Sequence, residues 1–365
     1  MIPNIIHFVF GLKEQKEEFL FCYYISILSS KLVNNPEKIY FHYHFEPFGF
    51  FWEKTKKIVE LHKVDIPEKI GNIDIIYTEH RADTVRINML KEYGGIYMDI
   101  DTISIRPYKF LLTKNFSMCR QKSPKNTLCN AVIFANKNSI FLDKWIDNYA
   151  KNFNNKGWGE SSLNLPYNLS KIYKNEIYIT DSDFFCEPSW DNIENIFYNN
   201  IEKIPENLIT LHLWNNKSKK YISIIQSFRW IIDNPHTLYS KIILYLVKEY
   251  NIHTYDYSFN YLKKYNDITQ NKVFYNNPVK HFQLYGYNEK RIFYSNKYIE
   301  NIIENEKDIN SKKKKSNILL KLKNIFEKKI YNKESISEKI YESIGKNDCI
   351  TRYVKYDLSV LELFV

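Results

Sequence analysis

Two carboxylates, Asp99 and Asp101, stand two residues apart in an apolar stretch of the chain. If this stretch is a strand, both side chains point to the same side of it. Like charges held so close repel each other unless a cation lies between them. Hard divalent cations prefer oxygen ligands and serve to hold diphosphates. The pair therefore indicates a site for Mn²⁺ or Mg²⁺, and a polar strand end facing solvent is the other interpretation.

The segment before this pair has apolar residues at helical spacing over residues 80–93 and ends at Gly94 and Gly95. Asp83 and Arg86 are three residues apart, so they share one face of the predicted helix. One interpretation is an ordinary surface ion pair, which contributes little stability. The other is that the pair borders the metal. Arg86 then holds a phosphate or a sugar hydroxyl, and Asp83 accepts a hydrogen bond from a sugar hydroxyl.

A third candidate ligand is His212, which lies in an alternating run with strand character over residues 209–214. A single histidine in a strand is usually a core or edge residue, yet oxygen-ligated metals also accept an imidazole. Trp158 and Trp214 are by default packing residues. The lysines in residues 217–220 indicate a solvated loop. The alternative is that this segment faces a diphosphate.

Two other polar groups have simpler interpretations. Asp181 and Asp183 form a second Asp-x-Asp, but their turn-like surroundings predict a loop. Ser161 and Ser162 open a predicted helix and are expected to cap it.

Residues 80–102 resemble the sugar-binding region of glycosyltransferases with a DxD motif. This family includes the yeast-type initiating α-mannosyltransferases, bacterial capsular enzymes and, more distantly, the clostridial glucosylating toxins. Further blocks with a family resemblance lie at residues 2–11, 128–135 and 211–214. The resemblance implies a GT-A-type fold and a metal-dependent, retaining transfer of a sugar from a nucleotide sugar. It implies a UDP-sugar as donor and a glycan or polysaccharide hydroxyl as acceptor.

The resemblance also implies roles for individual residues. Asp101 binds Mn²⁺ or Mg²⁺ directly, while Asp99 contacts the ribose or sugar and reaches the metal through water. Asp83 and Arg86 grip the donor sugar and count, with the two aspartates, as catalytic residues. His212 supplies a late metal ligand. The remaining residues expected to bind the nucleotide sugar are Phe8, Val9, Phe10, Tyr97, Asn130, Ala131 and Trp214.

Within that set, Phe10 matches an aromatic residue that stacks on uracil, and the indole N–H of Trp214 matches a group that meets the departing phosphate. The chain departs from the family pattern at Gly11, where a double glycine is usual, and after Trp214, where residues 215–220 match only loosely. These departures leave the base contacts and the third metal ligand open.

Two other function classes compete with this one. A sugar nucleotidyltransferase also uses paired carboxylates, but it needs a glycine-rich phosphate loop near the first strand, which Gly11 alone does not supply. A non-catalytic carbohydrate-binding protein would keep the fold and tolerate loss of Asp101 and Arg86.

Composition is that of an ordinary globular enzyme. The chain has 365 residues, of which 44% are hydrophobic, enough for one large domain and an appendage. Its five scattered cysteines include no C-x-x-C pair, which favours free thiols in a reducing compartment. We expect no signal peptide and no transmembrane segment, and hence a cytoplasmic location.

The net charge of +10 permits three kinds of partner: nucleic acid, a membrane surface or an anionic sugar nucleotide. We expect no nucleic-acid partner because no nucleic-acid-binding signature is present. Residues 312–329 combine lysines with apolar residues at helical spacing, which indicates a basic amphipathic helix. Such a helix either lies peripherally on a membrane or packs on the main domain.

The elements that must position these residues alternate between strand and helix, which predicts an α/β fold: a Rossmann-like, mostly parallel sheet flanked by helices. Predicted strands lie at 4–10, 39–45, 73–78, 96–101 and 130–135, and predicted helices at 13–33, 53–63, 80–93 and 138–152. We expect three parts: a GT-A domain over 1–250, a helical module over 251–302, and a charged linker with a basic tail over 303–365.

Overall fold

The computed structural model describes residues 1–122, 126–225 and 227–250, together with 252, 265–271, 274, 281, 285 and 289. The chain divides into two compact units, one of residues 1–226 with 231–252 and one of residues 227–230 with 253–365. Nearly all of the predicted helical module and the whole predicted basic tail lie outside the described residues. They stay predictions.

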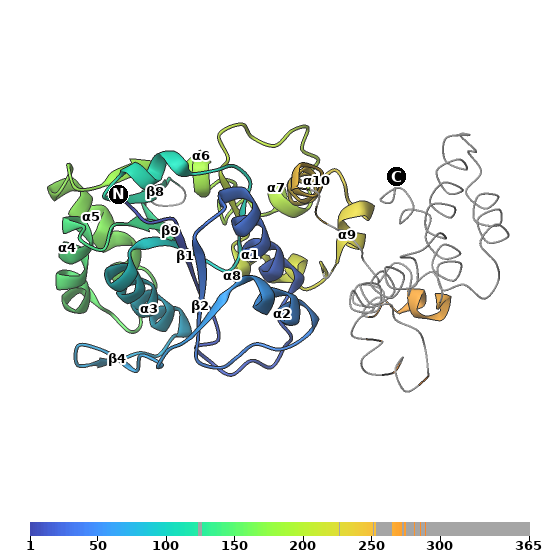
Figure 1. The fold of residues 1–365 in the computed structure, drawn as a ribbon, viewed down its shortest axis with the longest axis horizontal. Helices are drawn as coiled ribbons and strands as arrows, with labels where there is room; N and C mark the ends of the chain where they lie inside the picture. The colour runs from blue at the N-terminus through green and yellow to red at the C-terminus, as the bar shows by residue number, and fades with distance from the viewer. Residues whose placement is uncertain are drawn as a thin grey trace, which may run out of the picture. The chain divides into compact units, whose positions relative to one another are not determined.

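A seven-stranded sheet forms the centre of the first unit, within the described part of the chain (Figure 1). Its strand order is β10-β8-β9-β6-β1-β2-β3. Neighbouring strands are parallel except at β9, which runs antiparallel to both β6 and β8. The strands are β1 (Ile5–Val9), β2 (Lys38–Tyr43), β3 (Glu60–Lys63), β6 (Gly95–Met98), β8 (Phe116–Gln121), β9 (Thr127–Ala135) and β10 (Tyr178–Thr180). The expected α/β class with a mostly parallel sheet is confirmed.

Two small antiparallel pairs accompany this sheet. β4 (Lys69–Ile70) pairs with β5 (Ile73–Asp74) in a hairpin. β7 (Thr102–Ser104) pairs with β11 (Thr210–His212), which brings a late segment of the chain back to the end of β6.

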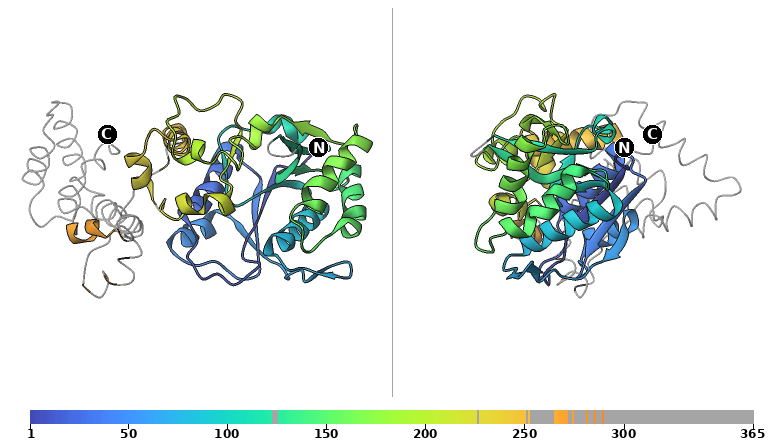
Figure 2. Two further views of the ribbon diagram at one scale, coloured as in Figure 1. Left: turned by 180° about the vertical axis from the view of Figure 1, so that it is seen from behind. Right: turned by 90° about the vertical axis from the view of Figure 1, so that its left-hand side faces the viewer.

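Helices flank the sheet on both sides. In Figures 1 and 2, α3, α4 and α5 lie on one side of the central strands, and α1 and α2 lie on the other. The helices are α1 (Phe21–Asn34), α2 (Phe50–Thr55), α3 (Thr78–Tyr93), α4 (Ile140–Tyr149), α5 (Leu165–Ile172), α6 (Ser182–Phe185), α7 (Glu194–Phe197), α8 (Asn215–Ile222), α9 (Phe228–Asp233) and α10 (Leu238–Tyr250). Short 3₁₀ turns lie at Lys56–Ile58, Lys109–Thr113, Ala150–Asn152 and Asn266–Gln270, and a π-helical turn lies at Glu160–Asn164.

Three predicted elements differ from the structure. The first helix begins at Phe21 rather than at residue 13, because residues 13–18 are mostly charged and offer no apolar stripe to the sheet. The helix expected over 53–63 stops early, and Glu60–Lys63 instead adds a parallel strand beside β2. The strand expected over 73–78 is only the two-residue strand β5 of a hairpin, followed by an irregular stretch that leads to the start of α3 at Thr78.

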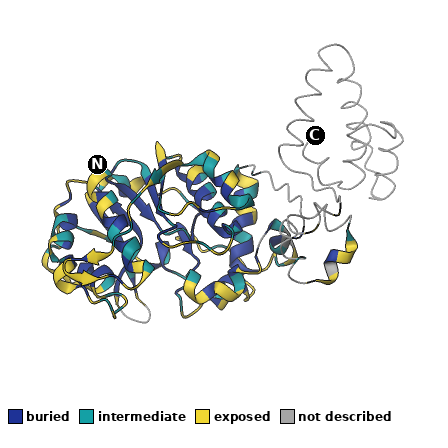
Figure 3. Cartoon of the chain, turned by 90° about the horizontal axis from the view of Figure 1, so that it is seen from below, coloured by how far each residue is buried: buried dark blue, intermediate teal, exposed yellow. Residues whose placement is uncertain are grey.

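The core lies between the sheet and the helices that cover it, where Figure 3 shows buried residues along the strands and the inner helix faces. On the side of α3 and α4 it contains Leu90, Ile133, Phe141 and Trp145, all without exposed surface. Burying such large apolar side chains is the main favourable contribution to folding. This core holds α3 rigidly against the end of β6, where the candidate site begins.

Candidate active site

Asp99 and Asp101 lie in the turn between β6 and β7 rather than on a strand. The backbone N–H and the hydroxyl of Thr102 both donate to the carbonyl of Asp99, at 3.1 and 2.7 Å, which closes the turn. We predicted that both carboxylates point to one side of a strand. That prediction was wrong, because β6 ends at Met98 and its four residues are buried on both faces. A tight turn, not a shared strand face, brings the two carboxylates together.

The glycine pair before β6 allows this strand to approach β1 closely. Gly94 and Gly95 have φ values of +67° and +108°, which non-glycine residues rarely adopt. A Cβ on Gly95 would lie 2.4 Å from the carbonyl oxygen of Ile5 on β1. The pair thus ends α3, as the sequence predicted, and sets the position of the acidic turn.

His212 reaches the acidic turn through the pairing of β11 with β7, in which it lies opposite Thr102. Its Nε2 is 3.5 Å from Oδ1 of Asp101 and 3.9 Å from Oδ2 of Asp99. One ligand atom from each of the three residues lies within 4.8 Å of the others. The structure therefore brings together all three residues that the sequence suggested as metal ligands.

Each carboxylate has one oxygen held by neighbours and one directed at the imidazole. Oδ1 of Asp99 accepts a hydrogen bond from the Tyr97 hydroxyl at 2.5 Å and pairs with Arg86 at 3.3 Å. Oδ2 of Asp101 accepts from the backbone N–H of Asn215 at 2.7 Å. Neighbours that fix the ligating side chains in this way are usual around metal sites. Two oriented carboxylates and one imidazole suit Mn²⁺ or Mg²⁺.

The pKa values in this cluster reflect strong mutual attraction in a buried place. Burial lowers the pKa of His212, but Asp101 outweighs burial and raises it to about 10. Burial raises the pKa of Asp101, but His212 and the N–H of Asn215 bring it below its usual value. Burial, with the charge of Asp101, raises the pKa of Asp99 to about 6 despite Arg86. The raised pKa of His212 favours its protonated form beside the carboxylates, and a metal ion bound at Nε2 would have to displace that proton.

Arg86 connects the acidic turn to α3. It forms ion pairs at 3.3 Å with both Asp83 and Asp99, and its guanidinium lies 4.2 Å from the ring centroid of Tyr97. It also donates to the carbonyl of Asn130 at 2.7 Å, while the Asn130 amide donates to Asp83 at 2.9 Å. The side chains of Arg86 and Asp83 are only 7% and 6% exposed, so this is not a surface ion pair.

Trp214 has a left-handed backbone, with φ of +55°, which is uncommon for a bulky residue. This conformation places its ring 3.8 Å from that of His212, measured between centroids, and starts α8 at Asn215. Its indole N–H donates to the carbonyl of Pro188 at 2.8 Å, so in this structure a backbone group occupies the atom expected to meet phosphate.

The remaining predicted residues differ in accessibility. Phe8 and Val9 are 0% and 6% exposed and pack in the core, whereas Phe10 is partly exposed and packs against Tyr23. Ala131 is also buried, and its carbonyl accepts from the N–H of Asp99 at 2.7 Å. Of Phe8, Val9 and Phe10, only Phe10, which directly follows β1, presents side-chain surface that a base could contact.

Sequence reasoning missed four neighbours of the site. Asn215 directly follows Trp214 and could have been found from that position. The hydroxyls of Ser162 and Tyr149 hydrogen-bond to Asp83, and the thiol of Cys129 lies beside His212, but no local pattern marks them.

Two simpler predictions have mixed outcomes. Asp181 lies exposed at the start of α6, 3.8 Å from Lys122 and apart from the metal-ligand cluster. The lysines in residues 217–220 lie in α8, so the predicted loop there was wrong.

The comparison with protein families agrees with this geometry. Residues 30–118 match the family described as "Glycosyltransferase sugar-binding region containing DXD motif". Asp99 and Asp101 form an acidic pair within the matched residues.

Two curated proteins are similar in sequence. Glucan organizing enzyme 1 of Cryptococcus neoformans is 28% identical over 239 residues, 61% of this chain and 65% of that protein. Human alpha-1,4-N-acetylglucosaminyltransferase is 26% identical over 174 residues, 44% of this chain and 48% of that protein. The chain thus spans less than two thirds of the length of either relative.

Among solved structures, mouse xyloside xylosyltransferase 1 matches with a TM-score of 0.38 and 10% identity, over 58% of this chain and 98% of that one. In the described part of the present chain, no helix is both long and apolar enough to cross a bilayer.

Proposed function

We propose that this protein is a metal-dependent, retaining glycosyltransferase that moves a sugar from a nucleotide sugar to a hydroxyl of a glycan or polysaccharide. A UDP-sugar is the proposed donor. The observation that carries the proposal is the convergence of Asp99, Asp101 and His212 beside the buried Arg86 network, within the region that matches the DXD family.

The proposed metal ligands are Asp99, Asp101 and His212. A bound Mn²⁺ or Mg²⁺ would neutralise the charge that develops on the departing diphosphate. The chain's own part is to hold the ligands in place: Tyr97 and Arg86 fix one carboxylate, and Asn215 fixes the other. Such a preorganised site needs little rearrangement when charge develops.

Asp83 and Arg86 are proposed to position the donor sugar. Asp83 is an acceptor suited to a sugar hydroxyl, and the Arg86 guanidinium carries several N–H donors in a fixed plane. Their mutual pairing, together with Asn130, keeps both side chains in one orientation. Retention of anomeric configuration rests on the family resemblance and is tested by following the product's anomeric signal by NMR.

Release of free nucleotide tests the proposal without knowledge of the acceptor. The protein is incubated with UDP-glucose, UDP-galactose, UDP-N-acetylglucosamine or GDP-mannose and with Mn²⁺, Mg²⁺ or EDTA. N-acetylglucosamine is included because one relative is named for its transfer. We expect slow hydrolysis of one donor with metal, none with EDTA, and nearly none in Asp101→Asn. Asp181→Asn, in the exposed second Asp-x-Asp, is the matched control and should retain the activity.

Full activity in Asp101→Asn would contradict the assignment of this residue. Release of pyrophosphate from a nucleoside triphosphate and a sugar phosphate would identify a nucleotidyltransferase instead. Failure to bind any nucleotide with Mn²⁺ would leave a carbohydrate-binding protein without catalysis.

A further inference from the structure

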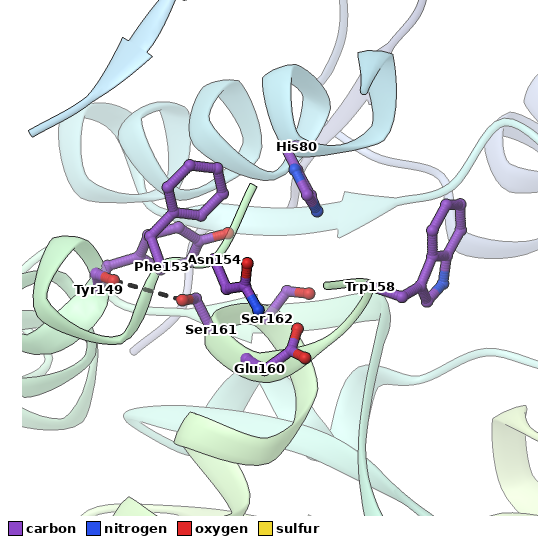
Figure 4. A pocket seen from close by; sticks show the side chains of 8 residues that line it. All are labelled: His80, Tyr149, Phe153, Asn154, Trp158, Glu160, Ser161 and Ser162. Carbon is purple, nitrogen blue, oxygen red and sulfur yellow. Dashed lines mark hydrogen bonds between the residues drawn. The ribbon is translucent and has the colours of Figure 1, made fainter. Parts of the chain in front are cut away.

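A small pocket lies next to Asp83 but outside the acidic turn (Figure 4). His80 of α3 enters it from one side, and Tyr149 at the end of α4 and Ser162 of the π-helical turn line the other. Trp158, on the loop between these elements, stands at its edge. Residues from three separate segments thus form its walls.

Exposed aromatic rings lead from the surface into this pocket. Trp158 is 57% exposed and Tyr77 is 41% exposed, and their ring centroids are 6.3 Å apart. Tyr77 contacts His80 at 5.6 Å, and His80 contacts the buried Phe153 at 5.1 Å. The interpretation of Trp158 as a packing residue was wrong, because more than half of its surface faces solvent. Exposed neighbouring aromatic residues beside a pocket are typical of binding sites.

The pocket also contains polar groups suited to hydroxyls. His80 is only 4% exposed, and its Nδ1 has no hydrogen-bond partner among the described residues. Glu160 adds an exposed carboxylate, and Ser162 adds a hydroxyl. The described lining includes no lysine or arginine, so the pocket does not suit a phosphate. Aromatic faces combined with hydroxyl, imidazole and carboxylate groups, and no cationic side chain in the described lining, favour a sugar ring.

Asp83 links this pocket to the acidic turn. Its carboxylate contacts Arg86 and Asn130 of the site, and it also accepts hydrogen bonds from Ser162 and Tyr149 of the pocket lining. Asp83 is itself buried, so it lies between the pocket and the acidic turn and contacts residues of both. A sugar at the mouth of the pocket would therefore lie beside, and not within, the place proposed for the donor.

The size of the pocket limits what it can hold. Its free space is about 160 Å³ when counted out to open solvent, and none of it encloses a space the size of a water molecule. A sugar ring therefore cannot enter the pocket and would lie over the exposed aromatic rings beside it. The C–H groups on one face of a pyranose suit the electron-rich face of an indole or phenol ring.

We propose that Trp158, Tyr77 and the adjoining pocket bind a pyranose ring of the acceptor. This inference rests on the proposed glycosyltransferase function and names the chemistry of its second substrate: a neutral pyranoside whose apolar face lies on Trp158. A hydroxyl of that ring reaches the exposed carboxylate of Glu160, which lines the pocket.

The test compares transfer with donor hydrolysis in Trp158→Ala and Tyr77→Ala. The acceptor probes are p-nitrophenyl hexopyranosides, and the hydrolysis assay contains no acceptor. We expect KM for the glycoside to rise about tenfold in Trp158→Ala, because this variant loses one aromatic contact with the sugar. Donor hydrolysis should stay within about twofold of the wild type. Trp158→Phe should restore part of the affinity. Tyr198→Ala, an exposed aromatic residue outside the pocket, is the matched control.

Unchanged acceptor KM in both alanine variants would overturn the inference. An equal fall of hydrolysis and transfer would also overturn it, because these residues would then serve the donor. Glycoside binding is followed in parallel by saturation-transfer NMR, which needs no turnover. A signal lost in Trp158→Ala supports the sugar site even where donor hydrolysis is absent and the proposed function fails. Equal signals in variant and wild type, or none in the wild type, contradict it.

Discussion

Arg86 and Asp99 form an ion pair between a buried guanidinium and a partly buried carboxylate, with Nη2 3.3 Å from Oδ1. The same guanidinium pairs with Asp83 at 3.3 Å, so one cation serves two carboxylates. Removing one partner of a buried pair leaves an uncompensated charge, which is far more costly than losing a surface pair. This relationship gives the first prediction.

Replacement of Arg86 by Met should lower the free energy of unfolding by ~3–5 kcal/mol, because the buried Asp83 and the partly buried Asp99 then lose their shared cation. Urea denaturation measures this change. Lys38→Met breaks the exposed pair with Glu60 and should change the free energy of unfolding far less than Arg86→Met does, because solvent screens this pair. The double variant Asp83→Asn/Arg86→Met should regain part of the loss. Equal effects of Arg86→Met and Lys38→Met would show that the network is not buried as described.

A second prediction concerns the close approach of β6 to β1. Gly95→Ala combines a positive φ with a Cβ placed 2.4 Å from the backbone carbonyl oxygen of Ile5. Neither strand can shift to relieve this overlap without a large cost in free energy. We expect a loss of more than ~3 kcal/mol in the free energy of unfolding. Gly71→Ala, also at positive φ but with its nearest neighbour 3.5 Å away, should lose only ~1–2 kcal/mol. Similar losses for both would mean that β6 does not require a glycine for its contact with β1.

The third prediction is a fall in stability at acid pH that comes from two buried histidines. Nε2 of His7 donates to the carbonyl of Gly94 at 2.8 Å, so its Nδ1 accepts from Nε2 of His42 at 2.9 Å. Burial lowers the pKa of His7 to about 4. Burial, with repulsion from His7 and His62, lowers the pKa of His42 to about 2.

Because the folded pKa of His7 lies below the ordinary value of 6.5, the unfolded chain binds more protons in this range. The contribution of neutral His7 to the free energy of unfolding is therefore fully present above about pH 6.5, and it is lost as the pH falls towards 4. The loss from His7 alone is ~2 kcal/mol by about pH 5. Urea unfolding of wild type and His7→Gln at several pH values isolates this contribution, since the other titrating groups are common to both chains. Parallel pH profiles would disprove the assignment.

The sequence predicted those features that depend on local pattern. The period of the apolar residues predicted a helix over 80–93, which the structure has at Thr78–Tyr93, and the glycine pair marked its end. The position of Asp83 and Arg86 on one helix face followed from their spacing of three. The strand assigned to residues 60–63 could not be found in this way, because its conformation depends on pairing with β2.

Features of the site that depend on distant pairing were harder to predict. Asn215 binds Asp101 from 114 residues away, through a register of β11 on β7 that no local pattern records. Family resemblance pointed to His212, whereas residue chemistry alone left its role open. Phe8 was expected at the base site, but a strand buried on both faces keeps its ring in the core.

The most direct test of the central claim is the binding of Mn²⁺ and UDP, measured by titration calorimetry on the full chain. Wild type and the control Asp181→Asn should bind UDP with Mn²⁺ and lose most of this affinity in EDTA. Asp101→Asn should stay folded and bind more than about 100-fold more weakly, because a metal ligand is lost. Metal-dependent UDP binding of wild-type strength in Asp101→Asn would contradict the account.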